Sequence, residues 1–299
     1  MQLSIKHILV LVMAMATTST AFAGSYDISL RGLGRPAPGN LNDAAYLRFQ
    51  KLGNELGMSL APRPLAPAET LGVSGFEFAF VTVHADISEE ENYWRGQPGS
   101  PVLRGVAEGN GVPGGFWIPT LHIRKGLPMS TELGITASYL AFSEMFLLGV
   151  ETKIGIHESY YRWVPSLALR GAVGTLFGSA DIKLTTVETD ILASLPIGID
   201  GIVQLTPYVG YGMVFVDVIS GIIDETPYDV QAVDQNGRSD GSLYVFERLN
   251  WNENRSHRVI LGMRATYAFF ELTYEIDIGI VPIANKTLQS HSIKIGFDT

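Results

Sequence analysis

The stretch FFELTYEIDIG, residues 269–279, alternates apolar and polar side chains. Phe270 and Leu272 fall on one side of the pattern, and Glu271 and Glu275 fall on the other. A period of two predicts a β-strand, because successive side chains of a strand point to opposite faces. The environment of the carboxylates then decides the fold class. A soluble sandwich turns its polar face toward solvent, whereas a membrane barrel turns it toward the lumen.

The chain begins like an exported protein. A basic start precedes a short apolar run, residues 8–16, and the small-residue site AFA follows at 21–23. The apolar run is too short for a membrane-spanning helix, which needs about 20 residues. We therefore expect residues 1–23 to be a signal peptide that is cleaved after Ala23.

The composition narrows the class of protein. The chain has no cysteine, which excludes disulfides, thiolate metal sites and a cysteine-linked lipid anchor. Its net charge of -9 argues against a nucleic-acid partner. Hydrophobic residues make up 46% and charged residues only 17%, and no second apolar run approaches a spanning helix. This combination favours a barrel that shows lipid an apolar band and keeps its polar groups inside.

Residues 24–70 differ from the rest of the chain. Residues 42–57 predict a short helix, with Asn42 as its cap and Gly57 as its end. The stretch SLAPRPLAPAE that follows is proline-rich and is expected to be extended. A helix this short needs a docking surface. We expect residues 24–70 to form a pre-barrel segment that lies either in the periplasm or in the lumen. The apolar stripe of the helix consists of Ala45, Phe49, Leu52 and Leu56.

Residues 71–299 predict an all-β, antiparallel up-and-down transmembrane barrel of about ten strands, within a range of 8–12. Most of the strands are longer than the five or six residues of soluble strands and match the roughly 9 to 11 of tilted membrane strands. A slip in the alternation at Thr185-Thr186 predicts a β-bulge there. The strands are expected at 75–83, 117–124, 131–141, 146–156, 165–175, 181–191, 201–217, 258–268, 269–279 and 291–297.

The connections between these strands are unequal in length. Residues 84–116 and 218–257 form long connections at one end, whereas residues 125–130 and the reversal at Ala268-Phe269 are short connections at the other. Outer-membrane barrels have short periplasmic turns and long external loops. An even number of strands then predicts that both termini lie on the periplasmic side.

Charged residues are gathered on the polar face of the strands. Opposite charges on neighbouring strands are expected to pair, because unpaired charges in a narrow lumen are costly. The pattern predicts either a structural network of ion pairs or a polar conduit for a small solute. The predicted lumen-facing ladder consists of Glu132, Glu151, Lys153, Arg170, Lys183, Arg264, Glu271, Glu275 and Asp277, and the same face carries Glu77, Asp181, Arg258 and Lys294.

The AFA site, the alternating strands from residue 71 onward and the terminal stretch HSIKIGFDT resemble the small Gram-negative outer-membrane β-barrel proteins. The resemblance implies an outer-membrane location, with membrane lipid and the barrel-assembly machinery as partners. That family usually ends in an aromatic residue, whereas here Asp298 and Thr299 follow Phe297. The proline-containing segment before the barrel is also similar to outer-membrane transporters of hydrophobic substrates, which have more strands.

Two hypotheses about function follow. The first is a non-enzymatic barrel that acts as a narrow, porin-like pore, a small-molecule transporter or a structural membrane protein. The alternative is an outer-membrane hydrolase with its site at the extracellular rim. For the hydrolase, His84 and Asp86 are candidates, with Asp217 across the mouth. His291 and Ser292 are weaker candidates, because alternation sends neighbouring side chains to opposite faces.

No motif predicts a cofactor or a metal site. The run DQNGRSDG, residues 234–241, resembles part of a calcium loop, but Ala232 stands where the first acidic ligand is needed. A solvated acidic loop is the expected structure. We find no phosphate loop, zinc motif or dinucleotide fingerprint in the sequence.

Overall fold

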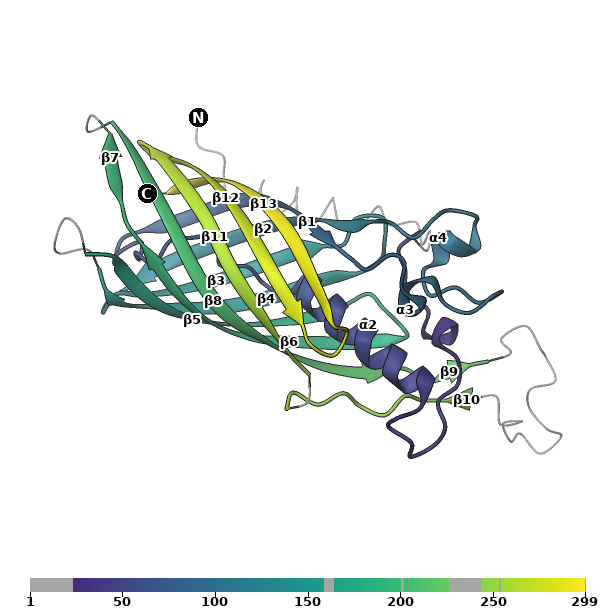
Figure 1. The fold of residues 1–299 in the computed structure, drawn as a ribbon. Coiled ribbons are helices and arrows are strands. Elements are labelled where there is room, and N and C mark those ends of the chain that lie inside the picture. The colour runs from purple at the N-terminus through teal and green to yellow at the C-terminus, as the bar shows by residue number, and fades with distance from the viewer. Residues whose placement is uncertain (1–23, 159–163, 200–201, 226–242, 253, 299) are drawn as a thin grey trace, which may run out of the picture.

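A computed structural model describes residues 24–158, 164–199, 202–225, 243–252 and 254–298. Ten long antiparallel strands form a closed barrel, in the order β11-β12-β13-β1-β2-β3-β4-β5-β6-β8, and β8 pairs with β11 to close it (Figure 1). This confirms the predicted all-β, up-and-down fold. The ten strands are β1 (Phe76–Asp86), β2 (Gly115–Leu127), β3 (Thr131–Tyr139), β4 (Phe146–His157), β5 (Ser166–Phe177), β6 (Ile182–Ser194), β8 (Val203–Ser220), β11 (Arg255–Tyr267), β12 (Phe270–Val281) and β13 (Lys286–Asp298).

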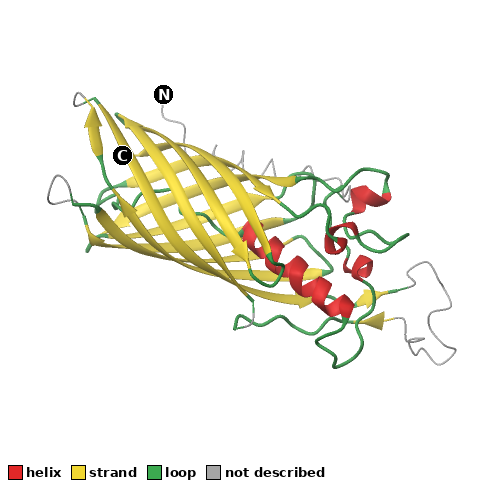
Figure 2. Ribbon diagram, viewed as in Figure 1, coloured by secondary structure: helices red, strands yellow, loops and turns green. Residues whose placement is uncertain are grey.

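Short elements lie at the two ends of the barrel, and one helix enters it (Figure 2). No helix in the described part of the chain is long and apolar enough to cross a membrane. The remaining elements are η1 (Leu30–Leu33), α2 (Ala44–Leu60), α3 (Asn92–Arg95), α4 (Arg104–Ala107), β7 (Ile197–Ile199), β9 (Ile223–Asp224) and β10 (Leu243–Tyr244). The long connections after β1 and β8 lie together at one end, which we call the long-loop end, and the opposite end is the turn end.

The outer wall of the barrel carries a band of apolar side chains. Phe80, Ile135 and Ile295 are each more than half exposed, and they alternate with buried neighbours along their strands. Such exposure to water on every strand would be unfavourable, because burial of apolar surface is the main driving force for folding. Closed barrels with this pattern place the band in the hydrocarbon of a membrane.

The predicted bulge at Thr185-Thr186 was wrong. β6 pairs with β5 and with β8 through both residues without a register shift. The slip in polarity has another cause, because Ile182 and Leu184 face inward near the long-loop end, where the interior is apolar. The inner face of β6 therefore changes from apolar to polar along the strand, while the alternation of inward and outward side chains continues without a break.

Helix α2 enters the barrel from the long-loop end (Figure 1). Its cap is Asp43 instead of the predicted Asn42, since the Asp43 carboxylate accepts a hydrogen bond from the backbone N–H of Ala45 at 2.9 Å. The predicted end at Gly57 was also wrong, because the helix continues to Leu60. Gly57 instead allows close packing, since a Cβ at this position would lie 2.7 Å from the methyl groups of Val216 on β8.

The chain continues from α2 through the barrel to the turn end. There the backbone N–H of Gly126, on β2, donates a hydrogen bond to the carbonyl of Gly75 at 3.0 Å, just before β1 begins. The other end of the segment lies at the long-loop end, where the Tyr26 N–H donates to the Phe142 carbonyl at 2.9 Å. The prediction that both termini share the periplasmic side was therefore wrong for the N-terminal end, because residues 24–75 cross the barrel once.

This topology predicts where an N-terminal epitope can be detected. If the leader is removed after Ala23, an epitope inserted before Gly24 should be labelled by antibody on intact cells. The same epitope in the β2–β3 turn, residues 128–130, should be labelled only after the outer membrane is permeabilised. Flow cytometry measures both, and labelling of the turn alone on intact cells would show that the orientation is reversed. N-terminal sequencing of the untagged exported protein should begin at Gly24.

The apolar band predicts that a charge on the outer face of β12 destabilises the protein. Ile276 lies at the middle of the strand on the outer face, so Ile276→Arg should lower the free energy of unfolding by about 2 to 4 kcal/mol. Ile276→Met is the matched control and should change it little. Urea titration of protein refolded into lipid vesicles measures both variants. Equal stability of the arginine variant and the wild type would contradict a lipid-facing position.

Candidate functional site

The barrel interior contains most of the ladder predicted from the sequence. Eight of its residues are buried: Glu132, Glu151, Lys153, Arg170, Arg264, Glu271, Glu275 and Asp277. Lys183 is the exception, and its assignment to the lumen was wrong. It is exposed on the outer face of β6 near the long-loop end, because its neighbours Ile182 and Leu184 take the inward positions in an apolar part of the interior.

A first cluster of charges lies near the turn end of the lumen. Arg124 on β2 lies between two carboxylates, with its Nε donating to Glu77 Oε1 at 3.0 Å and its Nη1 3.3 Å from Glu132 Oε2. Lys294 on β13 also joins two carboxylates, at 3.1 Å from Glu77 Oε2 and 2.5 Å from Glu271 Oε1. Each cation thus contacts acids on two strands, so the cluster ties the seam between the first and the last strand.

A second cluster lies deeper in the lumen and is centred on two guanidinium groups. Arg170 lies 2.6 Å from Glu151 Oε2, 2.6 Å from Asp190 Oδ2 and 3.3 Å from Glu188 Oε2. Arg258 reaches the same two β6 acids from β11, at 2.9 Å from Glu188 and 3.2 Å from Asp190. All five side chains are buried, so the charges compensate one another inside the barrel.

The predicted ladder omitted Glu188 and Asp190. Both lie on the alternation of Thr186, so a strand without the supposed bulge would have placed them inward with Leu184. His122 on β2 also faces this interior, and its Nε2 lies 2.8 Å from Glu151 Oε1.

The ladder also holds the chain that crosses the lumen, residues 44–70, which we call the plug. Arg63 Nε lies 2.9 Å from Asp277 Oδ2, and both side chains are almost fully buried. The Leu65 N–H donates to Glu275 Oε2 at 3.0 Å. Beyond α2 the plug has an extended backbone whose polar groups need partners, and the strand side chains supply them.

Further contacts fix the last part of the plug. Lys153 Nζ donates to the carbonyls of Pro67 and Glu69, at 3.0 and 2.8 Å, while it pairs with Glu132 at 3.1 Å. The Glu69 carboxylate lies 3.7 Å from Arg264 on β11. The plug is therefore held from strands on different sides of the barrel.

At the long-loop end, Glu55 joins the plug to the loop after β1. This fully buried carboxylate accepts hydrogen bonds from Tyr93 Oη at 2.7 Å, from Trp94 Nε1 at 3.0 Å and from the backbone N–H of Ser88. Burial and the hydrogen bond to Glu55 raise the pKa of Tyr93. No local pattern in the sequence predicts this role, because the partners of Glu55 lie 33 to 39 residues further along the chain.

The residues proposed for a hydrolase are not brought together. His84 Nδ1 lies 3.4 Å from Asp86 Oδ1, but both continue the outward alternation of β1. Asp217 on β8 pairs with Arg248 at 2.8 Å, and three strands separate β8 from β1. Ser292 is buried in the interior, whereas His291 contacts Tyr274 Oη at 2.9 Å on the outer side, as alternation predicts.

The candidate calcium run at 234–241 lies outside the described residues. Within the described residues, no group of three or more His, Cys, Asp or Glu side chains is placed to hold a metal ion.

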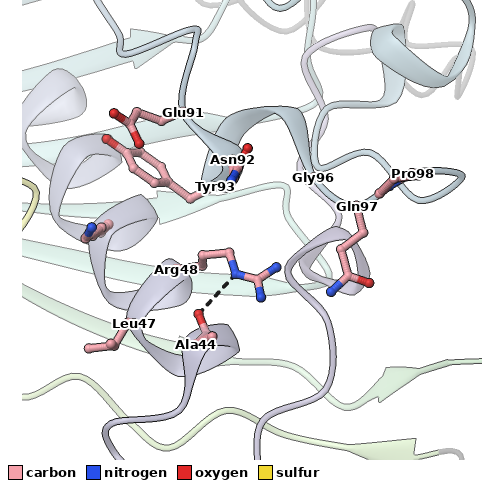
Figure 3. Close-up of a pocket in the computed structure, with 10 residues that line it drawn as sticks. Ala44, Leu47, Arg48, Glu91, Asn92, Tyr93, Gly96, Gln97 and Pro98 are labelled. Carbon is pink, nitrogen blue, oxygen red and sulfur yellow. Dashed lines mark hydrogen bonds between the residues drawn. The ribbon is translucent and has the colours of Figure 1, made fainter.

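A pocket of about 530 Å³ lies at the long-loop end, outside the barrel wall. One side is the exposed face of α2, with Leu47, Arg48 and Lys51, and the other side is formed by residues 91–93 and 96–98 (Figure 3). The barrel interior is occupied by the plug and by paired charges. This pocket lies outside that interior and has room for a small ligand.

No protein-family model matches the chain, and no curated protein matches it. Among solved structures it is similar to the N-terminal β-barrel domain of OprF from Pseudomonas aeruginosa, at 11% identity and a TM-score of 0.29, covering 76% of this chain and 99% of that one. LpxR from Salmonella typhimurium is 12% identical with a TM-score of 0.33, covering 74% and 99%. The translocator domain of autotransporter NalP from Neisseria meningitidis is 8% identical with a TM-score of 0.37, covering 75% and 88%.

These likenesses concern the fold alone, and the class of protein follows from the geometry of this chain. A closed antiparallel barrel with an apolar outer band and charges inside is a transmembrane β-barrel. The protein is therefore a transmembrane β-barrel of the outer-membrane type.

The second cluster, centred on Arg170 and Arg258, predicts that removing one cation lowers the stability of the protein strongly. Arg170→Met removes the cation that contacts all three buried carboxylates, so it should lower the free energy of unfolding by about 3 to 5 kcal/mol. Lys183→Met removes the same charge type from the outer face of the barrel and should change it by less than about 1 kcal/mol. Urea titration in lipid vesicles compares the two, and similar stabilities would show that the cluster is not structural.

Proposed function

We propose that the protein is a sealed, non-enzymatic outer-membrane barrel that anchors and displays an external layer, formed by residues 24–43 and 87–114 at its long-loop end. The observation that carries this proposal is the plug, which is held inside the barrel by side chains of several strands. Arg63, Leu65 and Lys153 all take part in these contacts. Of the non-enzymatic functions considered from the sequence, this supports a structural and display role over an open pore.

The paired charges support the same choice. A polar conduit needs charged groups that meet water along a continuous path, whereas Arg124, Arg258 and Lys294 are almost fully buried and each contacts at least two acids. In this arrangement the charges stabilise the closed interior instead of lining a channel.

The external layer shares a hydrophobic core with the long-loop end of the barrel. Trp94 and Phe116 are fully buried and their rings meet edge to face at 5.4 Å, and Leu30, Leu33 and Leu103 belong to the same buried cluster. A core of this kind gives the layer one fixed shape, since close-packed interiors specify a single arrangement. A barrel that carries a shaped layer presents a constant surface to the outside of the cell.

Conductance tests the sealed barrel. Wild-type protein in planar lipid bilayers should show no steady ion current, because the plug fills the lumen. A variant that lacks residues 44–66, with a flexible linker in their place, should open a current or destabilise the barrel. The wild-type measurement decides the proposal by itself, since a steady current through unmodified protein would show a pore.

A further inference from the structure

The external pocket described above, which we call the α2–α3 pocket, has an unusual balance of charge. Arg48 and Lys51 line it from α2. They are three residues apart, so they share one face of the helix. In the described part of the chain neither takes part in an ion pair, although the whole chain has a net charge of -9. Two uncompensated cations thus lie together on an acidic protein.

The acid at the rim of the pocket does not cancel these cations. Glu91 lines the pocket, but its carboxylate lies 2.7 Å from Lys286 Nζ on β13, so a separate cation matches its charge. Among the described residues, Arg48 uses only its Nε, in a hydrogen bond to the Ala44 carbonyl at 3.0 Å. In Figure 3 its guanidinium extends from α2 toward Gln97. Both terminal nitrogens of Arg48 therefore remain as donors toward the pocket.

The remaining lining suits a ligand that carries hydroxyl groups and a compact carbon skeleton. Asn92 and Gln97 bring amide groups to the wall opposite α2. Leu47 is 39% exposed and supplies an apolar patch beside the cations. The volume of about 530 Å³ lies in the range of small-molecule sites, roughly 300 to 1,000 Å³.

We propose that the α2–α3 pocket binds a small phosphate-bearing saccharide. A guanidinium with two free terminal nitrogens matches two phosphate oxygens in a bidentate contact, and an ammonium beside it adds a point charge. The amides of Asn92 and Gln97 are placed to bind sugar hydroxyls, and Leu47 packs against the ring. A free sugar phosphate and the phosphorylated saccharide headgroup of an outer-leaflet lipid share this chemistry.

The pocket is also joined to the plug. Tyr93 lines the pocket, and its hydroxyl donates to the buried Glu55 of α2. A ligand between Arg48 and Gln97 would therefore bridge the plug to the loop after β1. It should stabilise the protein against unfolding by an amount that rises with the logarithm of its concentration above the dissociation constant. This binding does not depend on whether the barrel is sealed.

Isothermal titration of the full-length protein in lipid nanodiscs tests the proposal. Glucose 6-phosphate or purified lipopolysaccharide should bind saturably, and glucose without phosphate should bind at least tenfold more weakly. Saturation by glucose 6-phosphate alone identifies a free ligand, and saturation by lipopolysaccharide alone identifies a lipid headgroup. Absence of saturable binding of both phosphate-bearing probes in the millimolar range overturns the proposal.

Paired variants separate the pocket from general electrostatics. Arg48→Ala/Lys51→Ala should weaken binding tenfold or more. Arg95→Ala/Arg104→Ala removes the same number of charges from the external layer, outside the pocket lining, and should leave binding within about twofold. Thermal melting of both double variants checks that they are folded. An equal loss of binding in the two would show a general charge effect, and the proposal would be wrong.

Discussion

A charge inside a narrow barrel has to be neutralised where it lies, and the architecture of this protein depends on that constraint. Removing an ion from water costs several kcal/mol, and attraction offsets this only where geometry is good. Arg170 on β5 and Arg258 on β11 meet the constraint by sharing Glu188 and Asp190 on β6. Because one acid serves two bases, three strands are tied together by a few side chains.

The same constraint explains why the plug and the barrel are one unit. Asp277 pairs with Arg63 of the plug, and Lys153 binds plug carbonyls as well as an acid of β3. Strand side chains thus supply the partners that an extended segment lacks. The plug in turn supplies a cation and backbone groups to a lumen rich in acids. Without the plug, lumen acids such as Asp277 would lose a cation, and without the strands the polar groups of the plug would lose their partners.

The strands could be located from the sequence because one face of each strand meets lipid. Alternation located the ten strands because lipid demands apolar residues on one face along most of each strand. It failed at Lys183, where the inner face packs on α2 and is apolar as well. Contacts such as Leu65 to Glu275 join residues 210 apart, and no local pattern predicts them. Residues 44–70 lie in the lumen, one of the two places expected for the pre-barrel segment. The side of the N-terminal end was mispredicted, since counting strands overlooks a crossing made by a helix and an extended segment.

That crossing has a consequence for how the protein is assembled. The strand that follows the plug, β1, pairs with β13, the last strand of the barrel. The external layer, whose buried Trp94 packs on Phe116 of β2, cannot pass in folded form through a lumen that the plug fills. Residues 24–43 must therefore cross the membrane as an unfolded chain or be enclosed while the β1–β13 seam is still open. If the seam closed before either event, residues 24–43 would remain at the turn end of a barrel that lacks its plug.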